Sequence, residues 1–326
     1  MPNYITNLFF VYLSENIRAI ISGTYNMKKL IFIYLIILSF LTVGCSSEKA
    51  KTTASKRYIA EMEAWRAKRI KNLKSETGWL NLVGLFWLKE GENTFGSGKS
   101  NNIVFPEDMP ERIGKFYLKN DTVKVVINDK VNVSINGKNI RNAVLQNDIN
   151  GKPDILAWKN FRWFIIKRGD RYGVRLRNLN AELVKDFKGI ESYPLDEKWK
   201  VKAEFIPYSE PKILEIPTII GTVEEDTAKG YLKFELEGKK FTLDPIDAGE
   251  KLFIIFADKT SGKETYGGGR FLYVPKPGSS GNTVIDFNKA YNPPCAFTKY
   301  ATCPLPPKDN YLSLEVTAGE KNYGHH

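Results

Sequence analysis

The residues that can carry chemistry are concentrated near the end of the chain, in residues 258–320. This stretch contains two cysteines, the densest prolines and three glycines directly before Arg270. Its polar residues follow no regular period, so we expect specific local geometry rather than bulk burial to fix them. The candidate ligand-binding or catalytic residues are Asp258, Thr265, Tyr266, Arg270, Asp286, Asn288, Tyr291, Asn292, Asn310 and Glu320.

The carboxylates and the arginine of this stretch have two uses in proteins. A pair such as Asp286 and Glu320 can divide the acid and base roles of glycoside hydrolysis. The same carboxylates can instead accept hydrogen bonds from loop amides, because the prolines keep the loop from pairing as sheet. Arg270 can receive an anionic ligand, or it can pair with Asp286 or Glu320 and brace the loops. The bracing interpretation is the favoured one for these residues.

Histidine limits the chemistry that is available. The two histidines, His325 and His326, are the last residues of the chain. No internal histidine exists to act as a general base, a triad member or a zinc ligand. The sequence therefore disfavours the usual serine and cysteine hydrolases and most zinc sites, and we expect neither a metal nor a cofactor. Acid–base chemistry would fall to carboxylates, Lys, Tyr or Cys.

The segment around Met27 has the pattern of a bacterial export signal. Two lysines follow Met27, and the apolar run after them, residues 30–40, is shorter than the about 20 residues of a membrane span. Gly44 before Cys45 resembles a lipobox, although Thr42 stands where that motif usually has Leu. The alternative is ordinary secretion with cleavage nearby. The pattern predicts a periplasmic or cell-surface protein that is held on a bacterial membrane by lipid at Cys45.

This interpretation divides the chain into five parts. Residues 1–26 are a mis-assigned start region, 27–45 a lipoprotein signal peptide and 46–55 a polar tether; 56–206 hold a helix and a first β sub-domain, and 207–326 a second β sub-domain with the loop cluster.

The chain is basic, with a formal net charge of +11. The excess is spread along the sequence, which favours a solvated face or weak attraction to anionic glycans and lipids. Nucleic acid is not an expected partner of an exported protein.

Cys295 and Cys303 would close a nine-residue loop. In an oxidising compartment a disulfide is the default for two cysteines so close together, and the chain-entropy model gives it roughly 2.5 kcal/mol. The alternatives are a thiol nucleophile or a thiolate metal pair, but the residues that usually support these are missing.

The rest of the exported part predicts one helix followed by strands. Apolar residues in 55–73 recur at spacings of three and four, with Ser55 placed to cap a helix that packs against the following sheet. Trp65 is expected in the core. From residue 103 onward, alternating runs separated by Asn120-Asp121 and Asn136-Gly137 predict β-hairpins. The fold class is therefore mainly β, with antiparallel strands in sandwich-like or barrel-like sub-domains.

Two details of these strands bear on function. In the hairpin of residues 163–177, Val174 and Leu176 should point inward and Arg175 and Arg177 outward. The outward arginines can bind an anion, but a solvated sheet face is the favoured interpretation. Residues 206–211 are expected to form the connector between the two sub-domains.

Several short motifs along the chain, taken together, resemble those of one protein family. They are Gly269-Arg270-Phe271-Leu272, the run of residues 286–297, Thr302-Cys303-Pro304-Leu305-Pro306-Pro307, Asn310, Ala318-Gly319-Glu320-Lys321, Thr265-Tyr266, the hairpin around Tyr172-Gly173-Val174-Arg175, Gly78-Trp79-Leu80 and Gly84-Leu85. They resemble the domain-of-unknown-function family 1684 over most of the exported part. The resemblance implies no activity or substrate, so no catalytic residue is transferred from it.

Three functions are consistent with these observations. The first, which we predict, is a cell-envelope lipoprotein that binds a glycan, peptide or small anionic ligand in a pocket beside Tyr266, Arg270 and Tyr291. The alternatives are a carboxylate-dependent hydrolase acting on envelope material and a purely structural module. A hydrolase requires two carboxylates facing one cleft, whereas a structural module requires the same polar residues to be buried and mutually hydrogen-bonded.

Overall fold

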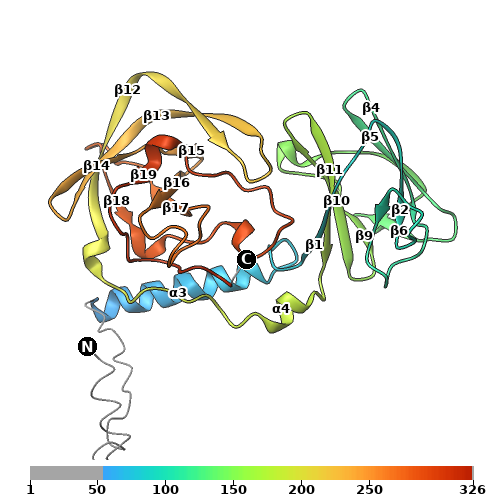
Figure 1. Ribbon diagram of the computed structural model, residues 1–326, viewed down its shortest axis with the longest axis horizontal. Coiled ribbons are helices and arrows are strands. Elements are labelled where there is room, and N and C mark those ends of the chain that lie inside the picture. The colour runs from blue at the N-terminus through green and yellow to red at the C-terminus, as the bar shows by residue number, and fades with distance from the viewer. Residues whose placement is uncertain (1–53, 325–326) are drawn as a thin grey trace, which may run out of the picture. The chain divides into compact units, whose positions relative to one another are not determined.

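The computed structural model describes residues 54–324, which belong to one compact unit, Thr52–His326 (Figure 1). The predicted start region, the predicted signal peptide with Cys45 and nearly all of the predicted tether lie outside the described residues. Within the described part, no helix has the length and apolar character needed to cross a membrane. The prediction of a mainly antiparallel β fold behind an N-terminal helix is confirmed.

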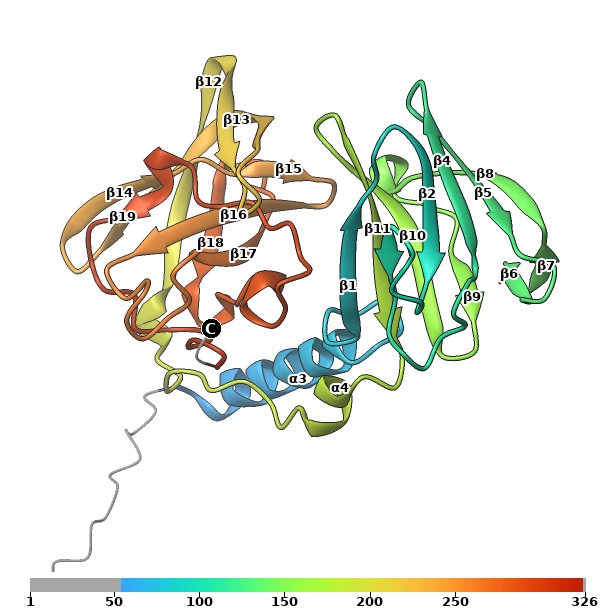
Figure 2. The ribbon, with the colours of Figure 1, turned by 45° about the vertical axis from the view of Figure 1, so that its right-hand side comes forward.

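The predicted helix is α3 (Lys56–Leu73), and Ser55 caps it by accepting a hydrogen bond from the amide of Tyr58. Its packing differs from the prediction, because its ion pairs, Arg69 with Glu320 and Glu61 with Lys289, join it to the C-terminal part of the chain. Figure 2 shows α3 running along the underside of the C-terminal strands. Trp65 is half-buried rather than a core residue.

Two mainly antiparallel sheets enclose the first hydrophobic core, which includes Phe95, Phe116 and Trp163. The ring centroids of Phe95 and Trp163, which come from different sheets, lie 6.2 Å apart. Positive φ angles at Asn120 and Asn136 confirm the predicted turns. The strands of the first sheet are, in spatial order, β1 (Leu82–Trp87), β11 (Arg171–Asn178), β10 (Phe161–Arg168), β9 (Leu156–Trp158), β6 (Val133–Ile135) and β7 (Lys138–Ile140). Those of the second sheet are β3 (Ile103–Val104), β2 (Gly91–Gly96), β4 (Gly114–Lys119), β5 (Thr122–Ile127) and β8 (Asn142–Leu145); within it, the pair of β2 and β3 is parallel.

A second pair of sheets encloses the second core, in which Trp199, Phe256 and Phe287 are fully buried. One sheet consists of β14 (Lys239–Leu243), β13 (Val223–Leu236), β12 (Lys200–Pro217) and β18 (Asn282–Asp286); the other consists of β15 (Ile246–Ala248), β16 (Lys251–Asp258), β17 (Arg270–Pro275) and β19 (Tyr311–Leu312). Short helices connect the strands: α4 (Glu182–Asp186), η1 (Asp148–Asn150), η2 (Glu197–Trp199), η3 (Phe287–Lys289), η4 (Pro294–Ala296) and η5 (Lys308–Asn310).

The prediction that residues 206–211 form a connector is wrong. Those residues lie inside β12, which pairs with β13 on both sides of an irregularity between Pro207 and Lys212. The two prolines of this region are accommodated because that irregularity interrupts the ladder, where a missing amide donor costs little. The strand β12 also pairs with β18 from Lys200 onward, so residues 200–206 share a sheet with the C-terminal part. The proposed division at residue 206 stays a prediction.

Candidate functional site

The predicted site residues around Arg270 form a buried brace. Arg270 is fully buried and forms an ion pair with Asp258 at 2.7 Å. It also donates to the carbonyl oxygens of Val316, at 2.9 Å, and Ala318. The predicted partner, Asp286 or Glu320, is therefore wrong. The prediction of a pocket beside Arg270 is also wrong, because these loop carbonyls and Asp258 enclose the guanidinium of Arg270.

The remaining oxygen of Asp258 organises the turn that follows β16. It accepts hydrogen bonds from the amide and hydroxyl of Thr260, at 2.8 and 2.6 Å, and from the amide of Val316 at 3.2 Å. The hydroxyl of Thr260 lies 2.9 Å from that of Thr265, which is also buried. Tyr266 is half-buried, and burial raises the pKa of its hydroxyl.

Glu320 forms a second brace, which reaches α3. Its carboxylate pairs with the guanidinium of Arg69 and accepts a hydrogen bond from the amide of Asn292 at 2.7 Å. Arg69 also donates to the carbonyl of Asn292 at 2.9 Å, and its guanidinium carbon lies 4.3 Å from the ring centroid of Tyr291. One ion pair thus holds the helix, the loop after η3 and the C-terminal segment together.

Asn288 and Asn310 are likewise internal. The side chain of Asn310 bonds the carbonyls of Asp244 and Ile255 at 2.9 and 3.0 Å. Asn288 donates to the carbonyl of Asp196 at 2.9 Å. Both side chains are buried and hydrogen-bonded to backbone carbonyls, as a structural module would require of these polar residues.

Cys295 and Cys303 lie at disulfide distance, with Cα atoms 6.1 Å apart. Both cysteines are buried. Each backbone amide also points at the sulfur of the other residue, at 3.1 and 3.3 Å. The pair closes the loop that carries Thr302, and this geometry agrees with the predicted disulfide.

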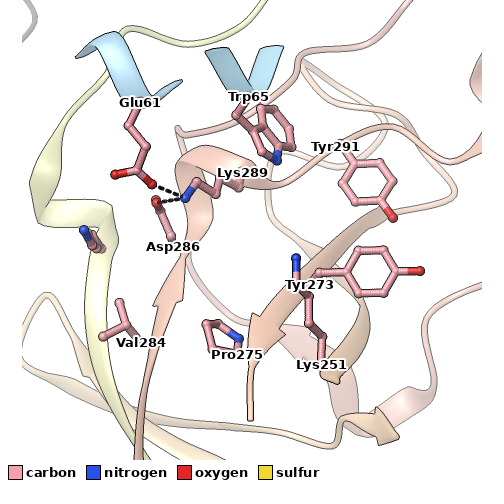
Figure 3. A pocket seen from close by; sticks show the side chains of 10 residues that line it. Glu61, Trp65, Lys251, Tyr273, Pro275, Val284, Asp286, Lys289 and Tyr291 are labelled. Atoms are coloured by element: carbon pink, nitrogen blue, oxygen red, sulfur yellow. Dashed lines mark hydrogen bonds and ion pairs between the residues drawn. The ribbon is translucent and has the colours of Figure 1, made fainter. Parts of the chain in front are cut away.

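A groove beside α3 brings together side chains that the sequence did not group. One part of it is a pocket of about 350 Å³ and the adjoining part has a volume of about 520 Å³. Figure 3 shows the first part, with Trp65 on the helix side, Tyr291 and Tyr273 on another and Lys251 rising toward the centre. The two parts share Trp65, Lys251, Tyr273 and Tyr291; the others are Glu61, Lys200, Pro275, Val284, Asp286 and Lys289 in the first, and Lys68, Arg69, Asn72, Leu73, Ser75, Thr77, Gly78 and Trp79 in the second.

The aromatic wall of the groove is exposed enough to contact a ligand. The rings of Tyr273 and Tyr291 lie nearly parallel, 18° apart, with centroids separated by 6.3 Å. Tyr273 is 46% exposed, although it belongs to β17, in which its neighbours Leu272 and Val274 are fully buried. That alternation is the signal that could have identified Tyr273 as a surface residue.

The charges of the groove are unevenly compensated. Lys289 lies 2.6 Å from Glu61 and 3.5 Å from Asp286, and its hydrogen bond to Glu61 holds the pKa of that carboxyl below its usual range. Asp286 also accepts a hydrogen bond from Tyr58 at 2.7 Å, and burial, together with this bond, raises the pKa of the Tyr58 hydroxyl. In contrast, no side-chain partner among residues 54–324 is found for Lys251.

Asp286 is therefore the predicted carboxylate that borders a cavity, and Glu61 accompanies it. Asp258 and Glu320 are instead committed to the two braces. Within the described residues, no group of three His, Cys, Asp or Glu side chains is placed to hold a metal ion.

The prediction that Arg175 and Arg177 point into solvent is wrong. Val174 and Leu176 are buried as expected, but Arg175 is only 3% exposed and Arg177 only 8%. The second face of β11 is covered by Trp79, whose ring lies 5.6 Å from the guanidinium of Arg175. Sequence alternation identifies the two faces of a strand, but it does not show what covers the second face.

The fold and these braces define a mainly antiparallel β protein with a stiff, proline-rich loop cluster packed on an N-terminal helix. Residues 185–321 match the family "Protein of unknown function (DUF1684)", and the chain belongs to this family. The resemblance seen in the sequence is thereby confirmed for these residues, and its extension to the motifs before residue 185 stays a prediction.

Solved structures give limited further information. An uncharacterized protein from Haloarcula marismortui is 30% identical, with 43% of this chain and 80% of that one covered and a TM-score of 0.36. The FHA domain of FhaA is 13% identical, with 28% of this chain and 97% of that one covered and a TM-score of 0.20. None of the curated proteins compared with the chain matches it.

Proposed function

We propose that the protein binds an acidic glycan in the groove beside α3. The observation that carries the proposal is an aromatic wall beside a free ammonium group. The wall is formed by the half-buried Trp65 and Tyr291 and the exposed Tyr273, and Lys251 next to it has no side-chain partner among residues 54–324. Aromatic faces can stack on the C–H faces of sugar rings, and lysines can pair with the carboxylates or phosphates of the glycan. The excess of cations around the groove favours an anionic ligand over a neutral one.

The contacts that Glu61 and Asp286 make with Lys289 favour binding over hydrolysis. A glycosidase needs one carboxyl group that stays protonated until it acts as the general acid. In the groove, Lys289 contacts both Glu61 and Asp286, and its hydrogen bond to Glu61 holds the pKa of that carboxyl below its usual range. The pair is therefore better suited to fixing a lysine than to donating a proton.

We expect oligogalacturonate, which has a carboxylate on each ring, to bind more tightly than neutral galacto-oligosaccharides of equal length. Tyr273→Ala should weaken this binding about fivefold to tenfold, a loss of about 1–1.4 kcal/mol, and Lys251→Gln should reduce the preference for the acidic chain. Isothermal titration calorimetry on the full-length protein measures both effects.

The matched control is Tyr311→Ala, because Tyr311 is also an exposed tyrosine, at 55%, and does not line the groove. Equal binding of acidic and neutral chains would contradict the proposal, as would an unchanged affinity in Tyr273→Ala. Release of new reducing ends from the oligosaccharide would favour the hydrolase instead.

We further propose that the protein acts at the periplasmic or outer face of a bacterial membrane, held there by lipid at Cys45. The charged, apolar and small residues that precede Cys45 support this location. Cys45→Ala should abolish the incorporation of labelled palmitate and move the protein from the membrane pellet to the supernatant. Retention of label in the variant would rule out Cys45 as the acceptor.

A further inference from the structure

A second cavity, apart from the acidic-glycan groove, lies where β10 and β11 face the proline-rich loops. Its volume is about 780 Å³, within the range of small-molecule sites. Apolar side chains form much of its wall, including Phe253 and Phe271, whose rings meet edge to face with centroids 5.0 Å apart. Its full lining is Trp79, Ile149, Lys167, Arg168, Gly169, Arg175, Val223, Glu224, Glu225, Phe253, Phe271, Pro294, Thr302, Cys303 and Pro304.

Two arginines of this cavity converge on one hydroxyl. Arg168 donates through Nε to the Oγ1 of Thr302 at 3.0 Å, and Arg175 donates through Nη2 to the same oxygen at 3.1 Å. Thr302 is held in place because Cys303, beside it, is joined to Cys295. The shared acceptor is neutral, so it offsets little of the charge of the two guanidinium groups.

The two arginines differ in how their charge is balanced. Arg168 pairs with the carboxylate of Asp148, at 2.8 Å for Nη2. Arg175 has no ion pair with any carboxylate of residues 54–324, and its buried Nε has no hydrogen-bond partner there. Burial, with a smaller contribution from Arg168, lowers the pKa of Arg175 to about 10, so the group is still charged at neutral pH.

A charged group that is 97% buried and lacks a counter-ion is costly to keep in a folded protein. An anion placed in the cavity beside Arg175 would supply the missing negative charge. Glu224 and Glu225 also line this cavity, and they disfavour an anion that carries several charges. A single carboxylate on an apolar body fits both the isolated guanidinium and the aromatic wall.

We propose that this cavity binds a small carboxylate with an apolar body, whose carboxylate pairs with Arg175 while its apolar part lies against Phe253 and Phe271. The site is independent of the acidic-glycan groove, although Trp79 borders both.

Octanoate is a suitable probe, with octanol as its neutral counterpart and acetate as its head group alone. In calorimetric titrations of the full-length protein, octanoate should bind and the other two should bind at least about tenfold more weakly. Arg175→Met keeps much of the side-chain volume and should lower the octanoate affinity about tenfold or more. Arg171→Met is the matched control, because Arg171 is an exposed arginine on the same strand, and it should leave the affinity unchanged.

A second variant guards against an effect of Arg175→Met on folding. Val223 is 63% exposed and lines the cavity, so Val223→Asp should fold normally while it places a repelling charge beside the ligand. It should weaken octanoate binding about threefold or more, with an unchanged circular dichroism melt. The proposal is overturned if octanol binds as well as octanoate, if Arg175→Met retains wild-type affinity, or if Val223→Asp has no effect.

Discussion

Asp258→Ala is expected to lower the free energy of unfolding by about 3–5 kcal/mol, the range measured when one partner of a buried ion pair is removed. Asp258 and Arg270 have fully buried side chains. Without the carboxylate, the guanidinium keeps its bonds to the carbonyls of Val316 and Ala318 but loses its counter-ion. Urea denaturation followed by circular dichroism measures the change.

Two variants separate this effect from the loss of any surface charge. Glu92→Gln disrupts the pair that Glu92 forms with Lys115, whose side chains are 43% and 47% exposed, and should cost far less stability than Asp258→Ala. The double variant Asp258→Leu with Arg270→Met replaces the pair by apolar groups and should recover part of the loss. Similar costs for Asp258→Ala and Glu92→Gln would show that Arg270 is not a buried, charge-dependent brace.

The elements that the sequence predicted correctly are those encoded by local pattern. The helix of residues 55–73 was predicted from apolar spacing and from the Ser55 cap, and the hairpins from turn residues that accept positive φ. These signals act within a few residues, so tertiary contacts changed little about them. The same reasoning misplaced the 206–211 connector, because it took prolines as the end of a strand rather than as an irregularity within one.

The candidate site depends on contacts between distant segments, and these were predicted less well. The sequence identified Arg270 as a brace but assigned it Asp286 or Glu320, whereas Asp258 is its partner across the β16–β17 pair. Nothing local indicated that Trp65 would share a groove with Tyr273 and Lys251, which come from strands about two hundred residues later. The burial of Arg175 likewise requires Trp79 and the loops to cover a second face of β11.

The two braces also explain how a proline-rich cluster can present a defined groove. Prolines limit the backbone but cannot donate the hydrogen bonds that fix one conformation. Here, carboxylates and guanidinium groups supply those bonds from α3 and from the C-terminal segment. The helix is therefore both a wall of the groove, through Trp65, and the support of the opposite wall, through Arg69 beneath Tyr291.

Glu320→Ala is accordingly expected to lower the free energy of unfolding by about 3 kcal/mol, near the lower end for a buried pair, because Arg69 remains 15% exposed. The variant removes the partner of Arg69 and the acceptor of the Asn292 amide together. Because Arg69 also lies against Tyr291, the groove wall should lose its fixed position. The affinity for oligogalacturonate should fall about fivefold under conditions in which the variant is still folded.

Glu191→Ala provides the matched control. Glu191 forms an ion pair with Lys321, the residue directly after Glu320, but the side chain of Glu191 is 72% exposed. Its loss should change the free energy of unfolding by about 0.5 kcal/mol or less and leave glycan affinity as in the wild type. Urea denaturation and calorimetric titration of both variants test the two effects separately. If Glu320→Ala reduced stability but not affinity, the ion pair would brace the fold without shaping the groove. If neither changed, Arg69 would not depend on Glu320, and the link from α3 to Tyr291 would have to be abandoned.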